Sequence, residues 1–140
     1  MALHEAALET TAAPELVWRI WSDPATWPEW NPDVIGIELD GGLAPGSRGR
    51  MTTKRGGTHE VEIESVEAGK SFWLVSTGLP GHRLAFRCQV LPNGSGSRIS
   101  QGVEVRGPLA GLLSGMMGKK IAQSFEPLLQ GLKRRAEGGA

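Results

Sequence analysis

The chain has a single cysteine, no excess charge of either sign and no long apolar run. Cys88 alone cannot form an intramolecular disulfide, and the first residues carry no secretion signal, so we expect a cytoplasmic protein. The most apolar stretch, Leu109 to Met117, is interrupted by glycine and serine and is shorter than the ~20 residues that span a bilayer. The sequence therefore predicts no membrane insertion.

Charge also excludes one class of partner. The 15 Lys and Arg residues balance 15 Asp and Glu residues, so the chain lacks the positive field that attracts nucleic acid, and we expect no nucleic-acid partner. A chain of 140 residues has the usual size of one domain, with a core large enough to leave room for a cavity.

The first 33 residues predict a strand followed by two short helices. Residues 4–11 are compatible with a strand, and Pro14 and Glu15 favour a helix start, with apolar spacings of three and four up to residue 22. Asp23 can cap a second short helix that includes Trp27 and ends at Asn31.

From residue 34 to residue 106 the apolar pattern has a period of two, which is typical of an antiparallel meander. Along residues 58–66, His59, Val61 and Ile63 alternate with glutamates, so one face is apolar and the other polar. Glycine-containing turns separate the strands. The same alternation predicts three further rows on one face: Ile35, Ile37, Leu39; Leu84, Phe86, Cys88, Val90; and Ile99, Gln101, Val103, Val105.

From residue 109 to about residue 135 the apolar pattern returns to a helical period, with one apolar stripe. Pro127 removes a backbone donor, so we expect a kink near Gln123, and residues 137–140 should fray. The order of elements predicts an α+β fold in which this long helix covers the apolar face of a curved sheet of about seven strands. The stripe consists of Leu113, Met117, Ile121, Phe125, Leu128 and Leu132.

Several stretches resemble the START-like, Bet v 1-like (SRPBCC) superfamily, specifically its polyketide cyclase/dehydrase and lipid-transport branch. They are residues 13–18 (APELVW), residues 23–24 (DP) and residues 27–32 (WPEWNP). The resemblance implies a helix-grip fold over residues 1–136, with a cavity between the sheet and the terminal helix. Members bind lipids, sterols, polyketides and plant hormones. Some only carry a ligand, some cyclise or dehydrate it, and others bind protein partners.

Metal and nucleophile motifs are missing from the sequence. Its histidines, His4, His59 and His82, are scattered, and no Cys-x-x-Cys, His-Glu-x-x-His or Gly-x-Ser-x-Gly pattern occurs. We therefore expect no metal and no cofactor.

Three polar residues on the inward face are candidates for catalysis. His59 and His82 could act as general acid or base, and Gln101 could polarise a carbonyl group. A half-exposed histidine bonded to a backbone carbonyl is the commoner arrangement, and a buried glutamine needs a partner, a water or a ligand.

The cavity has a predicted mouth, wall and floor. Trp27 and Trp30 should lie at the mouth, while Trp18 and Trp73 could form flat walls. The glycines around Met116 and Met117 suggest either a close backbone approach or a mobile gate. The residues expected to contact a ligand are Trp18, Trp27, Trp30, Ile37, Met51, Ile63, Phe86, Gln101, Val103, Leu113, Met116, Met117 and Ile121.

These features favour a protein that binds or carries a small hydrophobic or amphipathic ligand, lipid-, polyketide- or isoprenoid-like, as a monomer or weak homodimer. Two alternatives remain open, a cyclase or dehydratase acting on a polyketide-like substrate and a partner-binding module without a ligand. A cavity below about 300 Å³ would favour the module.

Overall fold

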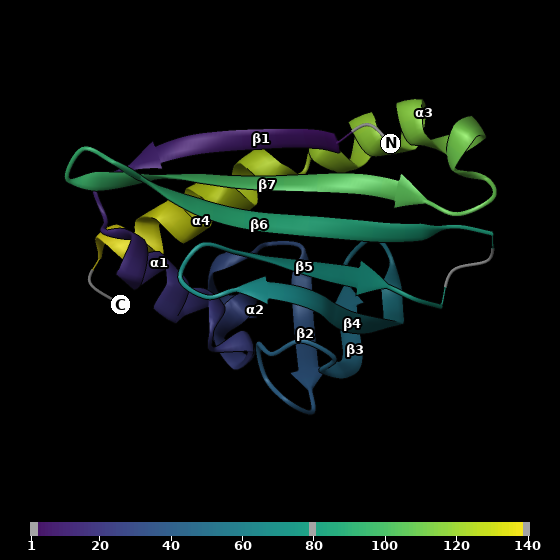
Figure 1. Ribbon diagram of the computed structural model, residues 1–140, viewed down its shortest axis with the longest axis horizontal. Helices are drawn as coiled ribbons and strands as arrows, with labels where there is room; N and C mark the ends of the chain where they lie inside the picture. Colours follow the sequence, from purple (N-terminus) through teal and green to yellow (C-terminus); the bar gives the residue numbers. More distant parts are fainter. Residues whose placement is uncertain (1–2, 79–80, 139–140) are drawn as a thin grey trace.

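A computed structural model describes residues 3–78 and 81–138, without the side chains of Leu113 and Ser114. One antiparallel sheet has the strand order β1-β7-β6-β5-β4-β3-β2. The predicted meander after residue 34 is confirmed. β1 forms one edge of the sheet and pairs with β7 (Figure 1). The strands are β1 (Leu3–Thr10), β2 (Val34–Leu39), β3 (Arg48–Thr53), β4 (Gly57–Glu67), β5 (Ser71–Ser76), β6 (Arg83–Asn93) and β7 (Gly96–Arg106).

Helices form the second layer. Between β1 and β2 lie α1 (Pro14–Trp21), the 3-10 turn η1 (Pro24–Thr26) and α2 (Trp27–Trp30), as predicted. After β7 come α3 (Ala110–Ala122) and α4 (Phe125–Glu137). Figure 1 shows α4 crossing behind β7 and β1, while α3 lies at the far end of these strands. Within the described ranges, none of the helices has the length and apolar character needed to cross a membrane.

The C-terminal helix is interrupted where the sequence predicted a kink. Gln123 and Ser124 separate α3 from α4, so the distortion is a complete break. The break places Pro127 in the first turn of α4, where a backbone N–H would have no partner within the helix. The Ser124 hydroxyl donates to the Ile121 carbonyl oxygen at 2.7 Å and satisfies one acceptor at the end of α3.

The apolar core lies between the concave face of the sheet and α4. Val61 and Ile63 on β4 are buried as their alternation predicted, and they pack in one cluster with Leu129 and Leu132 of α4. Burial of a leucine side chain contributes roughly 1.5–3 kcal/mol, so the α4 stripe is a main stabilising contact of the fold. The helix-grip arrangement is therefore confirmed.

A β-bulge corrects one predicted row of side chains. The pairing of β2 with β3 shifts between Val34 and Gly36, so Ile35 is the extra residue. Ile35 consequently lies outside and is 57% exposed, whereas Ile37 packs against the core. Strict alternation had placed both residues on the inner face. The bulge shifts the alternation by one residue, so Ile35 no longer shares a face with Ile37.

The end of α4 is anchored to β1. The Glu137 carboxylate accepts hydrogen bonds from the Thr10 hydroxyl at 2.8 Å and the Thr11 backbone N–H at 3.2 Å. These bonds stabilise the charged form and hold the pKa of Glu137 below its ordinary value. Glu137, where the sequence predicted fraying, is thus held in place, and residues 139–140 lie outside the described residues.

Gly131 provides a test of the contact between α4 and α2. A Cβ atom at this position would overlap the Trp30 carbonyl oxygen, so Gly131→Ala must push the two helices apart. We expect the free energy of unfolding in urea to fall by about 1–3 kcal/mol. Gly115→Ala is the matched control, because its Cβ would meet no atom within 4 Å and alanine favours a helix. Equal effects of the two substitutions would contradict the close contact.

Candidate functional site

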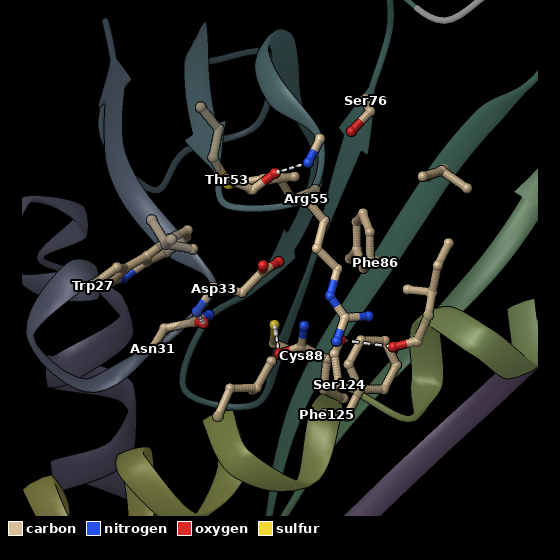
Figure 2. A pocket seen from close by; sticks show the side chains of 18 of the residues that line it. Trp27, Asn31, Asp33, Thr53, Arg55, Ser76, Phe86, Cys88, Ser124 and Phe125 are labelled. Carbon is tan, nitrogen blue, oxygen red and sulfur yellow. Dashed lines mark hydrogen bonds between the residues drawn. The ribbon is translucent and has the colours of Figure 1, made fainter.

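A cavity of about 380 Å³ lies between the concave face of the sheet and the C-terminal helices. Figure 2 shows it bounded by strands on one side, and by Ser124 and Phe125 at the junction of α3 and α4 on the other. Its volume lies within the range of small-molecule pockets, which starts near 300 Å³. The apolar lining residues are Trp21, Trp27, Trp30, Val34, Met51, Phe72, Leu74, Leu84, Phe86, Cys88, Met117, Ile121, Phe125 and Leu128.

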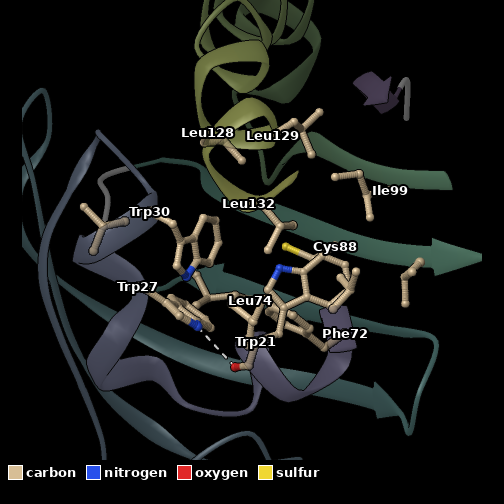
Figure 3. Packing of buried hydrophobic residues seen from close by; sticks show 14 of the residues in the cluster. Trp21, Trp27, Trp30, Phe72, Leu74, Cys88, Ile99, Leu128, Leu129 and Leu132 are labelled. Atoms are coloured by element: carbon tan, nitrogen blue, oxygen red, sulfur yellow. Dashed lines mark hydrogen bonds between the residues drawn. The ribbon is translucent and has the colours of Figure 1, made fainter. Parts of the chain in front are cut away.

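Aromatic side chains form one end of the cavity (Figure 3). The Trp27 ring stacks on Phe72 with centroids 5.9 Å apart, and Trp21 meets Phe72 edge-on at 5.5 Å. The Trp27 indole N–H donates to the Trp21 carbonyl oxygen at 3.1 Å, which fixes the orientation of the ring. These contacts make a rigid apolar wall.

Trp30 adds a polar atom to this wall. Its side chain is 7% exposed, and its indole Nε1 has no hydrogen-bond partner within the described part of the chain. An unpaired buried N–H costs about 1–3 kcal/mol, so an oxygen atom of a bound molecule would be a favourable partner.

The polar lining residues come from several elements, and one of them, on β5, lies at the other end of the cavity from Phe72. Inward positions along β5 run from Ser76 through Leu74 to Phe72, so the wall changes from a hydroxyl to an aromatic ring over two steps of the alternation. Ser76 is 1% exposed, and its hydroxyl oxygen has no partner among the residues that the structure describes. The polar lining residues are Asn31, Asp33, Thr53, Arg55, His59, Ser76, His82, Gln101 and Ser124.

Both candidate histidines line the cavity. His59 is half-buried on β4, and its Nδ1 lies 3.2 Å from the Gly57 carbonyl oxygen, which is the common structural arrangement of a histidine at a turn. His82 is half-buried directly before β6. Gln101 also lines the cavity, so the structure brings together the three residues that the sequence singled out for acid–base chemistry.

Gln101 and Cys88 face each other on paired strands. The Cys88 thiol donates to the Gln101 side-chain oxygen at 3.5 Å, a weak bond that gives the glutamine a partner inside the sheet. Burial raises the pKa of Cys88 to about 12, because the thiolate cannot be solvated there. The thiol therefore stays protonated at neutral pH and contributes to the wall as an apolar group.

Of the residues predicted to contact a ligand, several lie at the cavity wall and others do not. Ile63 and Val103 face the same side but are fully buried in the core, because neighbouring side chains cover them. Trp18 packs edge-on against Trp21 and Phe72, with centroids 6.2 and 6.3 Å away, and lies behind the aromatic wall. Ile37 packs against the core without reaching the cavity. Those at the wall are Trp27, Trp30, Met51, Phe86, Gln101, Met117 and Ile121.

The predicted floor is corrected at one of its two methionines. Met117 lines the cavity, but Met116 is 84% exposed, since consecutive helix residues point about 100° apart. The side chain of Leu113 lies outside the described residues. A Cβ at Gly118 would overlap the His4 imidazole, so this glycine permits a close approach of α3 to β1.

Trp73, a possible wall residue in the sequence, lies on the outer face of the sheet. It pairs with Arg87 in the ladder, and the Arg106 guanidinium lies 5.2 Å from its ring centroid. A second bulge, between Ile63 and Ser65, places Ser65 opposite Trp73 on this outer face.

Some lining residues were not identified from the sequence. Ser76 follows Leu74 and Phe72 in the alternating row of β5, so periodicity carried a signal for it. Arg55 and Asp33 lie in irregular segments, where periodicity says nothing about side-chain direction. Within the described residues no three His, Cys, Asp or Glu side chains come together as a metal site.

A curved antiparallel sheet that grips a terminal helix around a cavity defines a helix-grip protein. A family model described as "Polyketide cyclase / dehydrase and lipid transport" matches residues 1–137, so the chain belongs to this family. The resemblance of the three sequence stretches is thereby confirmed. A search of curated proteins finds no match.

Solved structures share the fold at low sequence identity. A START superfamily protein from Mycobacterium smegmatis is 21% identical, with a TM-score of 0.73 and 99% of each chain covered. Ara h 8.0201 is 15% identical, with a TM-score of 0.73 and 98% of each chain covered. Truncated norcoclaurine synthase from Thalictrum flavum is 16% identical, with a TM-score of 0.68, 95% of this chain and 91% of that one covered. Such likenesses establish the fold alone.

The raised pKa of Cys88 predicts an unreactive thiol. At pH 8 a group of pKa about 12 is ionised to only ~10⁻⁴, so native protein should react with a disulfide reagent at least about a thousandfold more slowly than protein unfolded in urea. The native rate should also rise about tenfold for each pH unit below that pKa. A native rate close to the unfolded rate would contradict the burial of Cys88.

Proposed function

We propose that this protein binds or carries a small hydrophobic or amphipathic molecule in the cavity between its sheet and its C-terminal helices. The observation that supports this proposal is the 380 Å³ cavity with an aromatic and aliphatic lining. At about 30 Å³ for each water-sized group, this volume accommodates about a dozen non-hydrogen atoms. A fatty acid of medium chain length or a molecule with two fused rings has that size.

Burial of apolar surface would supply the affinity. Covering about 200 Å² of apolar ligand surface contributes roughly 5 kcal/mol at about 25 cal/mol per Å², before the cost of immobilising the ligand is subtracted. The rigid wall of Trp21, Trp27 and Phe72 reduces that cost, because these side chains are already ordered. No catalytic group is needed for this function.

Cavity size also bears on the alternative of a partner-binding module. The volume exceeds the limit of about 300 Å³ below which the sequence favours a module without a ligand. The cavity volume therefore favours ligand binding over a partner-binding module without a ligand.

A substitution that narrows the cavity tests this function. Leu84 is half-buried at the wall, and Leu84→Trp should weaken binding of 1-decanol at least tenfold, because the indole occupies ligand space. Binding is measured by titration calorimetry, with circular dichroism to verify folding. Gln89→Trp, on the opposite face of β6 from Cys88 and Val90, is the matched control and should leave the affinity unchanged. Equal affinity of a folded Leu84→Trp variant would refute a ligand in the cavity.

A specific observation favours an enzyme as the second candidate, since His59, His82 and Gln101 all line the same cavity. In this reading one imidazole transfers a proton and the amide of Gln101 polarises a carbonyl group of a polyketide-like substrate. Norcoclaurine synthase, which shares the fold, carries the name of an enzyme, but a shared fold does not transfer an activity.

The two candidates differ in their dependence on the histidines. If the protein is a cyclase or dehydratase, turnover of a poly-β-ketone substrate should fall about a hundredfold or more in the double variant His59→Gln, His82→Gln. Binding of 1-decanol should persist in that variant. Turnover that survives the double substitution would eliminate catalytic roles for His59 and His82. If the wild-type protein shows no turnover, ligand binding is the candidate function that remains.

A further inference from the structure

The β5 wall of the cavity changes from polar to aromatic along its length. Ser76 and Phe72 are four residues apart on β5, which separates them by roughly 13 Å at about 3.3 Å per residue. On the antiparallel strand β6, Leu84 lies opposite Ser76 and Cys88 lies opposite Phe72. This wall therefore favours a ligand whose polar group lies at the Ser76 end, while the unpaired Trp30 N–H leaves one polar atom at the aromatic end.

Arg55 provides the positive charge at the cavity wall. It lies in the turn between β3 and β4, and Figure 2 shows its side chain extending from this turn toward Ser124. No hydrogen bond or ion pair joins its guanidinium to any other part of the chain that the structure describes. The five N–H donors of Arg55 are thus available to a ligand.

The turn that carries Arg55 is itself held in place. The Thr53 hydroxyl accepts a hydrogen bond from the Gly56 backbone N–H at 2.9 Å, and the Lys54 N–H donates to the Asp33 carbonyl oxygen at 2.9 Å. These bonds on both sides of Arg55 fix its backbone, so only the side chain has to adjust when a ligand binds.

Ser76 gives an independent indication of a polar ligand group. Its hydroxyl is almost fully buried, lines the cavity and lacks a partner within the described residues. A buried hydroxyl is normally hydrogen-bonded, so an unpartnered one that faces a cavity is suited to a ligand atom. Asp33 is the one carboxylate among the lining residues.

Resting on the proposed function, we propose that the ligand is a medium-chain carboxylate whose head group faces Arg55 and whose apolar tail extends toward Trp27 and Phe72. The planar guanidinium matches a carboxylate with two parallel hydrogen bonds. Decanoate, with 12 non-hydrogen atoms, corresponds to the number that the cavity volume allows, about a dozen.

Three probes of equal chain length test the charge of the head group. Decanoate, 1-decanol and decylamine are titrated into the full chain at pH 7.5 by calorimetry. We expect decanoate to bind about tenfold more tightly than 1-decanol, and decylamine most weakly, because a hydrogen bond to a charged group outweighs a neutral one. If Arg55 contributed nothing to binding, 1-decanol should have the highest affinity of the three, because it is the least soluble in water.

Substitutions identify the residue responsible. Arg55→Met keeps the aliphatic stem and should weaken decanoate about tenfold but 1-decanol much less, because a hydrogen bond to a neutral hydroxyl is weaker than one to a carboxylate. Lys54→Met removes the neighbouring cation of the same turn, which does not line the cavity, and should change neither affinity. Asp33→Asn should strengthen decanoate severalfold, because it removes the opposing negative charge at the wall.

The outcomes separate this inference from the function on which it rests. If decanoate and 1-decanol bind equally and Arg55→Met affects neither, the carboxylate inference is overturned while the binding function stands. Preferential binding of decylamine, abolished by Asp33→Asn, overturns it in favour of a cationic ligand. If none of the probes binds the wild-type protein, the proposed function fails and the inference fails with it.

Discussion

The structure depends on how one interrupted helix covers an apolar sheet face. A sheet with seven strands and one apolar side must bury that side, and α4 does so with Leu128, Leu129 and Leu132. The break at Gln123 and Ser124 then takes α3 toward β1 and β7 (Figure 1). Side chains at the break, including Ser124 and Phe125, line the cavity, so the break forms part of the cavity wall.

The sequence predicted the fold well because the fold depends on regular patterns. Alternation along β4, glycine turns and the apolar stripe of the last helix are properties of many residues at once, so no single exception disturbs them. Pro127 allowed even the position of the helix break to be predicted, since a missing backbone donor has a definite geometric effect.

The site was less predictable because it depends on individual side chains. Ile35 is displaced by a bulge of one residue, and nothing in its local sequence distinguishes it from Ile37. Met117 lies on the apolar stripe predicted for the last helix, whereas Met116 lies outside that stripe and is 84% exposed, so helical periodicity separates the two methionines. Arg55 belongs to a turn, and turn side chains follow no period. Ser76 was within reach, since it continues the inward row of β5.

Everything proposed for this protein requires a small molecule in the space beneath the sheet. A crystal structure of the protein grown with decanoate would show whether that space is occupied. We expect one molecule whose alkyl chain lies between β5 and Phe125 and contacts Trp27 and Phe72. A cavity closed by repacked side chains, with decanoate absent or bound only on the outer surface, would contradict it.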